Sequence, residues 1–135
     1  MATAELESRL RASGVRPTSQ RLAVLGELAA EPNDATAQDL WQRLRGQVGL
    51  ATVYRTLALL HEHGVIDALS HHDGERCYRL CTGAHHHHLV CETCHRVVEI
   101  DECDLDPWVS RVAKRHGFVA DGHDLEIRGR CRDCR

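Results

Sequence analysis

Two pairs of cysteines, each separated by two residues, carry the strongest chemical signal in this sequence of 135 residues. Cys91 and Cys94 form the first pair, and Cys131 and Cys134 form the second. Each pair can bring two sulfurs to one metal ion, and two pairs complete the tetrahedral four-thiolate coordination of structural Zn²⁺ sites. Such a site contributes about 10–16 kcal/mol of apparent binding free energy, comparable with the stability of a small domain. The four cysteines therefore predict a structural zinc site with no open position for a substrate.

Four consecutive histidines, His85 to His88, precede the first cysteine pair and are followed by the apolar residues Leu89 and Val90. We expect a strand over residues 86–91. Because side chains alternate between the two faces of a strand, His85 and His87 should point to one side and His86 and His88 to the other. One strand thus offers a pair of imidazole ligands to each of two further metal sites.

The first half of the sequence has the periodicity and capping signals of helices followed by a hairpin. The predicted elements are helices at 4–12, 19–31, 37–45 and 51–63 and strands at 65–69 and 77–80. Thr18 and the Thr36-x-x-Asp39 capping box mark two of the helix starts, and Asp73-Gly74 is a hairpin turn signal. This order of elements predicts a winged helix-turn-helix DNA-binding domain over residues 1–80.

The second half predicts a small domain of mixed composition after a hinge at 81–84. Its expected elements are strands at 86–91, 96–100 and 125–127 and a helix from Pro107 to 116. This region, residues 85–135, has too few apolar residues for a large core, so the structural zinc should supply much of its stability. The fold class is therefore α+β, with two domains.

The helix at 51–63 has the properties of a DNA-reading helix. Val53, Leu57 and Leu60 lie on one face, so Arg55 is centred on the opposite face with Thr52 and Tyr54 beside it. An exposed arginine at this position can donate two hydrogen bonds to a guanine in the major groove. The alternative is an ordinary solvated face, and Arg16 is a further candidate for a phosphate or minor-groove contact.

The composition limits the possible partners and the compartment. The formal net charge is −3, so DNA binding must rest on a local basic patch. All but one of the 17 basic residues are arginines, which suits phosphate and guanine recognition but equally suits a GC-rich genome. The sequence has neither an apolar run of about 20 residues nor a signal-peptide pattern. We therefore expect a cytoplasmic protein with reduced thiols and no membrane partner.

Several segments together resemble the ferric uptake regulator family over nearly the whole chain. They are residues 14–21 (GVRPTSQR), 51–57 (ATVYRTL) and 85–91 (HHHHLVC), together with the two cysteine pairs. The resemblance implies a homodimeric, metal-activated repressor of double-stranded, palindromic DNA operators. It also implies that the second domain is an α/β dimerisation domain.

Within that family the sequence is most similar to the zinc uptake regulators, because Cys81 stands at the hinge. The resemblance implies a regulatory zinc site formed by Asp67, Cys81, His86 and His88, and a thiolate ligand favours Zn²⁺ over Fe²⁺ or Mn²⁺. It also implies a third site formed by His85, His87, Asp106 and His123, which gives two or three Zn²⁺ ions per subunit. Family members more often have Glu at the position of Asp106, and Asp101 or Asp104 is an alternative ligand.

The expected function is therefore zinc-dependent repression of zinc-uptake genes, with release of DNA by the metal-free form. A sensor of iron, nickel or peroxide with the same fold is the alternative. We do not expect an enzyme, a catalytic residue or a small-molecule substrate, because the sequence has neither a His-Glu-x-x-His motif nor the zinc deaminase signature. The residues set aside as inert thiols are Cys77 and Cys103, and the histidines expected to be solvated or near phosphate are His61, His63, His71 and His72.

Overall fold

The structure is a computed structural model that describes residues 1–71, 74–81 and 84–135. The chain divides into two compact units, residues 1–83 and residues 84–135. Neither unit contains, within the described ranges, a helix of the length and apolar character needed to cross a membrane. The predicted hinge at 81–84 includes Thr82 and Gly83, and the predicted turn includes Asp73, so both predictions lie partly outside the described residues.

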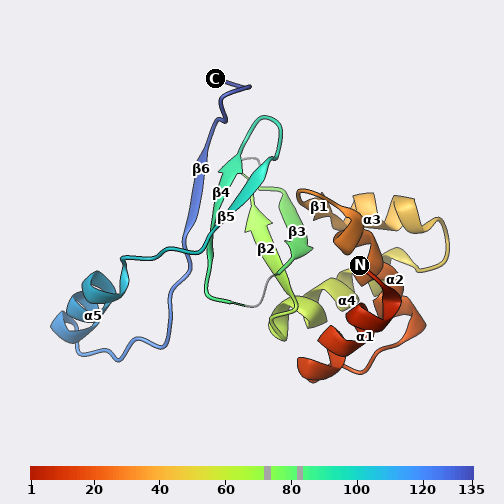
Figure 1. Cartoon of the computed structure of the whole chain (residues 1–135), viewed down its shortest axis with the longest axis horizontal. Helices are drawn as coiled ribbons and strands as arrows, with labels where there is room; N and C mark the ends of the chain where they lie inside the picture. Colours follow the sequence, from red (N-terminus) through yellow and green to blue (C-terminus); the bar gives the residue numbers. More distant parts are fainter. Residues whose placement is uncertain (72–73, 82–83) are drawn as a thin grey trace. The chain divides into compact units, whose positions relative to one another are not determined.

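The first unit consists of helices followed by a small antiparallel sheet (Figure 1). Its elements are α1 (Thr3–Ala12), α2 (Ser19–Ala30), β1 (Ala35–Thr36), α3 (Ala37–Leu44), α4 (Leu50–Glu62), β2 (Ile66–Ser70) and β3 (Arg76–Leu80). The strand order is β1-β3-β2, and both strand pairs are antiparallel. The winged helix-turn-helix elements therefore appear in the predicted order, with the short strand β1 as an addition that the sequence did not predict.

Two of the helices begin at the capping residues that the sequence indicated. The Thr18 hydroxyl accepts a hydrogen bond from the Arg21 backbone N–H at 3.2 Å at the start of α2. At α3 the capping box is complete, because Thr36 accepts from the Asp39 N–H and the Asp39 carboxylate accepts from the Thr36 N–H. These bonds satisfy backbone donors that would otherwise lack a partner within the helix.

The hydrophobic core of the first unit is formed by leucines and valines that its helices contribute. Val53, Leu57 and Leu60 of α4 are fully buried in it, as the periodicity predicted. Helix α4 is therefore fixed by its apolar face, while Tyr54 and Arg55 remain exposed on the other side.

A buried contact between His71 and Asp34 in the first unit corrects the expectation that His71 is solvated. The His71 Nε2 atom lies 2.8 Å from a carboxylate oxygen of Asp34, and both side chains are 1% exposed. The pair joins the residue after β2 to the segment before β1. Cys77 is also buried here, and its burial together with the charges of Asp34 and Glu75 raises the pKa of its thiol. The raised pKa disfavours the thiolate form of Cys77, whose inert role stays a prediction.

The second unit consists of a three-stranded sheet and one helix. Its elements are β4 (His87–Cys91), β5 (Val97–Ile100), α5 (Asp106–Arg115) and β6 (Glu126–Gly129), in the sheet order β5-β4-β6. Strand β4 pairs antiparallel with β5 and parallel with β6. The observed bounds differ from the predicted ones by only one or two residues. Strand β4 is central, and it is the strand that carries the histidines.

Candidate metal centres and nucleic-acid interface

The four predicted zinc cysteines come together at one end of the second unit. The sulfurs of Cys91, Cys94, Cys131 and Cys134 all lie within 4.8 Å of one another, and the Cys94 and Cys131 sulfurs are 3.7 Å apart. Four sulfurs at 2.3 Å from a tetrahedral Zn²⁺ have edges of about 3.8 Å. All seven cysteines, each within the described ranges, are free thiols, so the four are available as metal ligands.

Local backbone structure favours the thiolate form at this centre. The backbone N–H groups of Cys94, in the turn after β4, and of Cys131, in the segment after β6, hydrogen-bond to the Cys91 sulfur and lower the pKa of Cys91 to about 5. The Cys131 N–H lies 3.4 Å from that sulfur. A hydrogen bond with the Cys131 side chain raises the pKa of Cys134 to about 12. Several adjacent thiolates repel one another, and a bound dication removes that repulsion.

The four histidines at the start of β4, two before the strand and two within it, separate into two pairs, as the predicted alternation of side chains requires. The rings of His85 and His87 are 4.7 Å apart, centre to centre, and the rings of His86 and His88 are 4.8 Å apart. His123 joins the first pair, with ring centres 4.8 Å from His85 and 5.0 Å from His87. His87 and His88, the two histidines within β4, therefore lie on opposite faces of the strand, and His85 and His86, just before it, continue the alternation.

Around His85 and His87 the structure brings together a different set of residues from the one expected. The potential ligand atoms of His85, His87, Cys103 and His123 lie within 4.8 Å of one another. Asp106 is not part of this group; its carboxylate lies 3.9 Å from His123 Nδ1, and its side chain is 84% exposed. Cys103, which was predicted to be an inert thiol, is in this group, and the predicted ligand Asp106 is not. His87 is buried, and burial followed by the charges of His85 and His123 lowers its pKa, which favours the neutral form that binds metals.

On the other face of β4, His86 and His88 lie beside Glu99, a residue that the sequence analysis did not consider. One potential ligand atom from each of the three lies within 4.8 Å of the other two. The register of the sheet explains this proximity, because Glu99 on β5 pairs directly with His88 on β4. The Nδ1–H of His86 donates to the Ala84 carbonyl, which leaves Nε2 for a metal. The two other predicted regulatory ligands, Asp67 on β2 and Cys81, belong to the first unit.

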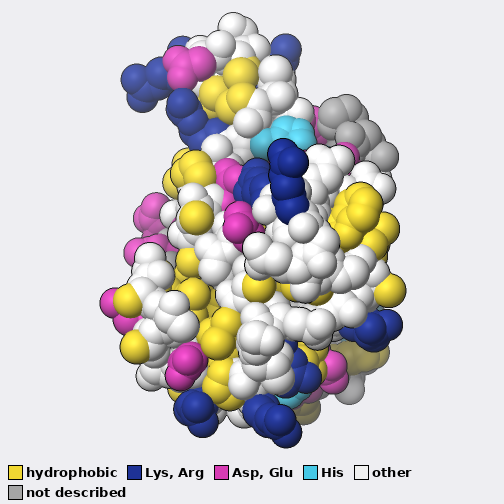
Figure 2. Space-filling view, turned by 90° about the vertical axis from the view of Figure 1, so that its right-hand side faces the viewer, with side chains coloured by type: hydrophobic (Ala, Val, Ile, Leu, Met, Phe, Trp, Pro, Cys, Tyr) yellow, Lys and Arg dark blue, Asp and Glu magenta, His cyan; other side chains and the backbone are white. Residues whose placement is uncertain are grey.

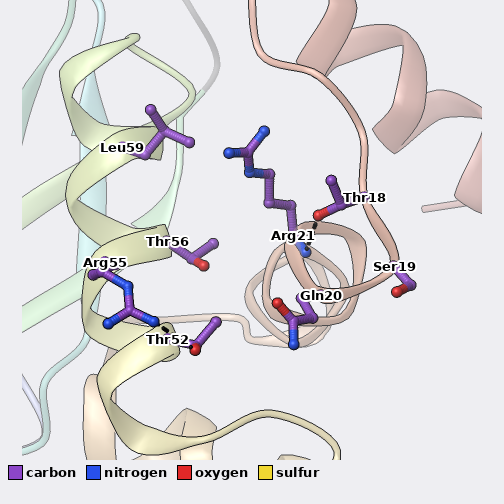
Figure 3. A pocket seen from close by; sticks show the side chains of 8 residues that line it. All are labelled: Thr18, Ser19, Gln20, Arg21, Thr52, Arg55, Thr56 and Leu59. Atoms are coloured by element: carbon purple, nitrogen blue, oxygen red, sulfur yellow. Dashed lines mark hydrogen bonds between the residues drawn. The ribbon is translucent and has the colours of Figure 1, made fainter.

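Two of the predicted DNA-contacting residues, Thr52 and Arg55, line a groove between α4 and the start of α2 (Figure 3), whereas Arg16 and Tyr54 are exposed and do not line it. Thr52, Arg55, Thr56 and Leu59 line it from α4, and residues 18–21 line it from α2. The Arg55 guanidinium donates to the Thr52 hydroxyl at 3.0 Å, which holds the side chain along the helix and leaves its other N–H donors for a ligand. Arg21 donates to the Arg16 carbonyl at 2.8 Å, and Tyr54 is 50% exposed.

Basic side chains do not form one broad patch on the face shown in Figure 2. Arginine and lysine side chains are spread among acidic and apolar ones there, as the formal net charge of −3 would suggest.

Comparison with known proteins identifies relatives over nearly the full length. The model of the ferric uptake regulator family matches residues 12–128. The zinc uptake regulation protein of Mycobacterium tuberculosis is 41% identical over 129 residues, which cover 93% of this chain and 99% of the relative. The ferric uptake regulation protein of Escherichia coli K12 is 32% identical over 133 residues, which cover 93% of this chain and 89% of the relative.

Solved structures agree with these sequence relationships. A zinc uptake regulator complexed with zinc and DNA has a TM-score of 0.79 at 27% identity, with 97% of this chain and 91% of that chain covered. The crystal structure of holo XcZur has a TM-score of 0.77 at 27% identity, with 97% of this chain and 94% of that chain covered. The chain belongs to the ferric uptake regulator family.

Proposed function

We propose that this protein is a zinc-responsive transcriptional repressor. Its zinc-loaded homodimer binds palindromic operators and represses genes for zinc uptake, and the metal-free form releases DNA. The observation that carries this proposal is the composition of strand β4, which supplies residues to ligand groups on both of its faces and, through Cys91, to the four-cysteine group. The 41% identity with a zinc uptake regulation protein favours zinc as the metal that is sensed.

The first role of zinc in this proposal is structural. Zinc bound by Cys91, Cys94, Cys131 and Cys134 would join the turn after β4 to the segment after β6. An exposed ion pair between Arg96 and Asp133, with N and O 3.0 Å apart, connects the same two segments. Such a surface pair contributes little stability, so the metal centre is the main connection between them.

The second role is regulatory, and we assign it to Asp67, Cys81, His86 and His88. Asp67 and Cys81 belong to the unit with the DNA-reading helix, and the two histidines belong to the unit with β4. Side chains from both units, held on one ion, would restrict the hinge and favour one arrangement of the dimer's two α4 helices. Glu99 is close enough to the histidines to contribute a further oxygen ligand or to orient an imidazole. The Cys81 thiolate gives the site its preference for zinc.

In this proposal α4 reads the operator. Arg55 contacts guanine, Thr52 positions Arg55 through the hydrogen bond between them, and Tyr54 and Arg16 contact the backbone or a groove edge. The apolar face of α4 is fixed in the core. The exposed face can therefore enter a major groove without any change in the packing of the first unit.

We expect Arg55→Ala to weaken specific operator binding by about 1–3 kcal/mol, because it removes a bidentate base contact. Binding to operator and to unrelated duplexes should be compared at one salt concentration, since phosphate contacts are salt-dependent. Arg11→Ala is the matched control, because Arg11 is an exposed arginine on α1 outside the groove. An equal loss of affinity for the operator and for unrelated duplexes would show that Arg55 contacts phosphate and does not read a base.

Two exposed apolar surfaces of the second unit support the homodimer. On the sheet, Leu89 lies between its pairing partners Val98 and Ile127, and the three side chains are 42–46% exposed. Near α5, the side chains of Trp108, Phe118 and Val119 are 56%, 71% and 89% exposed. Contiguous apolar surface of this kind marks an interaction site, and a second copy of the chain would cover it.

The proposed function is tested by a metal titration. Zn²⁺, Fe²⁺, Mn²⁺ and Ni²⁺ are added to chelator-buffered protein while binding to a palindromic operator is measured. We expect zinc to promote binding at the lowest free concentration, because only zinc combines high affinity for a thiolate with tetrahedral preference. A response to iron or nickel at lower concentration than to zinc would instead support the alternative sensor. Loss of an enzymatic turnover on metal removal, with no effect on DNA, would refute the repressor.

A further inference from the structure

The group formed by His85, His87, Cys103 and His123 has the geometry of a metal centre with a sulfur ligand. Three atoms, His87 Nε2, Cys103 Sγ and His123 Nε2, form a triangle with every side 3.2 Å long. The nearest ligand atom of His85 completes the group within 4.8 Å of the others. All four residues belong to the second unit and to described segments.

The triangle matches what three ligands of one tetrahedral ion require. With Zn–N distances of 2.0–2.1 Å and a Zn–S distance of 2.3 Å, the N–N edge is about 3.3 Å and the S–N edges are about 3.5 Å. The observed separations of 3.2 Å lie within about 0.3 Å of these edges.

Asp106, the carboxylate that the family resemblance implies as a ligand, is placed to act on His123 from the other side. Its oxygen lies 3.9 Å from Nδ1 of His123, while Nε2 of the same ring faces Cys103 and His87. A carboxylate beside the second nitrogen of a ligating histidine orients the ring and increases its basicity. The Asp106 side chain is mostly exposed, as is usual for such an outer partner at a surface centre.

We propose that His85, His87, Cys103 and His123 form a thiolate centre for Zn²⁺, and that Asp106 is a positioning residue for His123 and not a ligand. The inference rests on the proposed function only in taking zinc as the resident metal. One sulfur in place of a carboxylate oxygen makes the centre softer, so it should retain zinc against Mn²⁺, Fe²⁺ and other oxygen-preferring ions. The third centre of this chain would then be permanently loaded and stabilising, while the centre with Cys81 responds to supply.

Cobalt substitution tests the ligand assignment directly, because Co²⁺ bound by a thiolate has a charge-transfer absorption in the near ultraviolet that N/O-ligated Co²⁺ lacks. The full-length Cys81→Ser protein, with zinc retained in the four-cysteine site, is titrated with Co²⁺. When Cys81 is replaced by serine and zinc occupies the four-cysteine site, two thiols in the described chain still lie close to histidines. They are Cys103 and the buried Cys77. Zinc analysis before and after the titration verifies that the four-cysteine zinc has not exchanged.

We expect the absorption band in Cys81→Ser and its loss in Cys81→Ser/Cys103→Ser, whereas Cys81→Ser/Cys77→Ala should keep it. Asp106→Asn should keep the band but weaken cobalt binding by about 10–100-fold, as outer-partner changes do. Glu102→Gln, at a nearby exposed carboxylate outside the group, is the matched control for charge and should keep both the band and the affinity for cobalt. A band that survives Cys103→Ser, or cobalt binding that requires Asp106 and is unaffected by Cys103→Ser, would overturn the proposal. None of these readouts involves DNA, so they are independent of the outcome of the operator titration.

Discussion

A Cys94→Ser variant is expected to lose its structural zinc and to unfold residues 84–135, while residues 1–83 keep their fold. The second unit has a small core, since its described buried residues are Val90, Cys91 and Val97 with two histidines. Within the described chain, no side chain of α5 is buried. The metal contributes about 10–16 kcal/mol of apparent binding free energy, which exceeds what so few buried side chains can supply. Loss of one of the four thiolates should therefore unfold this unit.

The first unit should survive because its hydrophobic core is made by its own helices and sheet. Hydrogen exchange of the backbone amides distinguishes the two units. We expect fast exchange across 84–135 and preserved protection in α2, α3 and α4, together with loss of zinc from the purified protein. Dimer formation should also fail, because the exposed apolar surfaces lie on the unfolded unit.

Cys77→Ala is the control for this experiment, since it removes a buried thiol from the first unit and leaves the four zinc ligands intact. It should retain zinc and the protection of residues 84–135. Unchanged protection of that segment in zinc-free Cys94→Ser protein would show that the second unit is stable without its metal. The structural role assigned to the four cysteines would then be wrong.

The sequence predicted the features that depend on local patterns. The capping box at Thr36 and the cap at Thr18 are local, and both were found. The separation of His85 and His87 from His86 and His88 follows from the pleat of one strand. The buried side of α4 follows from helical periodicity. Each of these features is specified by residues within a few positions of one another.

Features that depend on contacts between distant segments were not predicted. The Asp34–His71 pair joins residues 37 positions apart, and neither residue lies in a pattern that indicates burial. Cys103 lies between β5 and α5, where no periodicity fixes the direction of a side chain, so its approach to His87 and His123 followed only from the structure. The proximity of Glu99 to His88 required the register of β4 and β5. A search for Cys, His, Asp and Glu outside regular elements would have found Cys103 as a candidate.

We expect Cys81→Ser to abolish the zinc response of operator binding while keeping the fold. Conversion of a two-state equilibrium from 1:99 to 99:1 requires about 10⁴-fold tighter binding of the metal to the active state. The Cys81 thiolate is the softest of the four proposed regulatory ligands, and a serine hydroxyl is a poor zinc ligand at neutral pH. Without the thiolate, most of that differential affinity is lost, so the inactive arrangement should prevail at zinc concentrations that saturate wild-type binding.

The backbone at residue 81 is held by bonds that serine leaves intact. The Arg9 guanidinium donates to the Cys81 carbonyl at 2.7 Å, and the Cys81 N–H donates to the Val65 carbonyl at 3.2 Å. Serine has nearly the same volume as cysteine, so the first unit should be undisturbed. A loss of DNA binding in this variant can therefore be attributed to the metal ligand and not to unfolding.

The measurement is operator affinity across a series of zinc buffers, with the four-cysteine zinc content determined in parallel. Wild-type affinity should rise steeply with free zinc, whereas the affinity of Cys81→Ser should stay near its metal-free value. Cys103→Ser is the informative comparison, because it removes a thiol from the third centre and should leave the zinc response of the Cys81 centre in place. If Cys103→Ser loses the response and Cys81→Ser keeps it, the sensing and stabilising roles of the two thiolate centres must be exchanged. If neither loses it, zinc acts on DNA binding through the four-cysteine site alone, and the hinge is not where the metal signal is read.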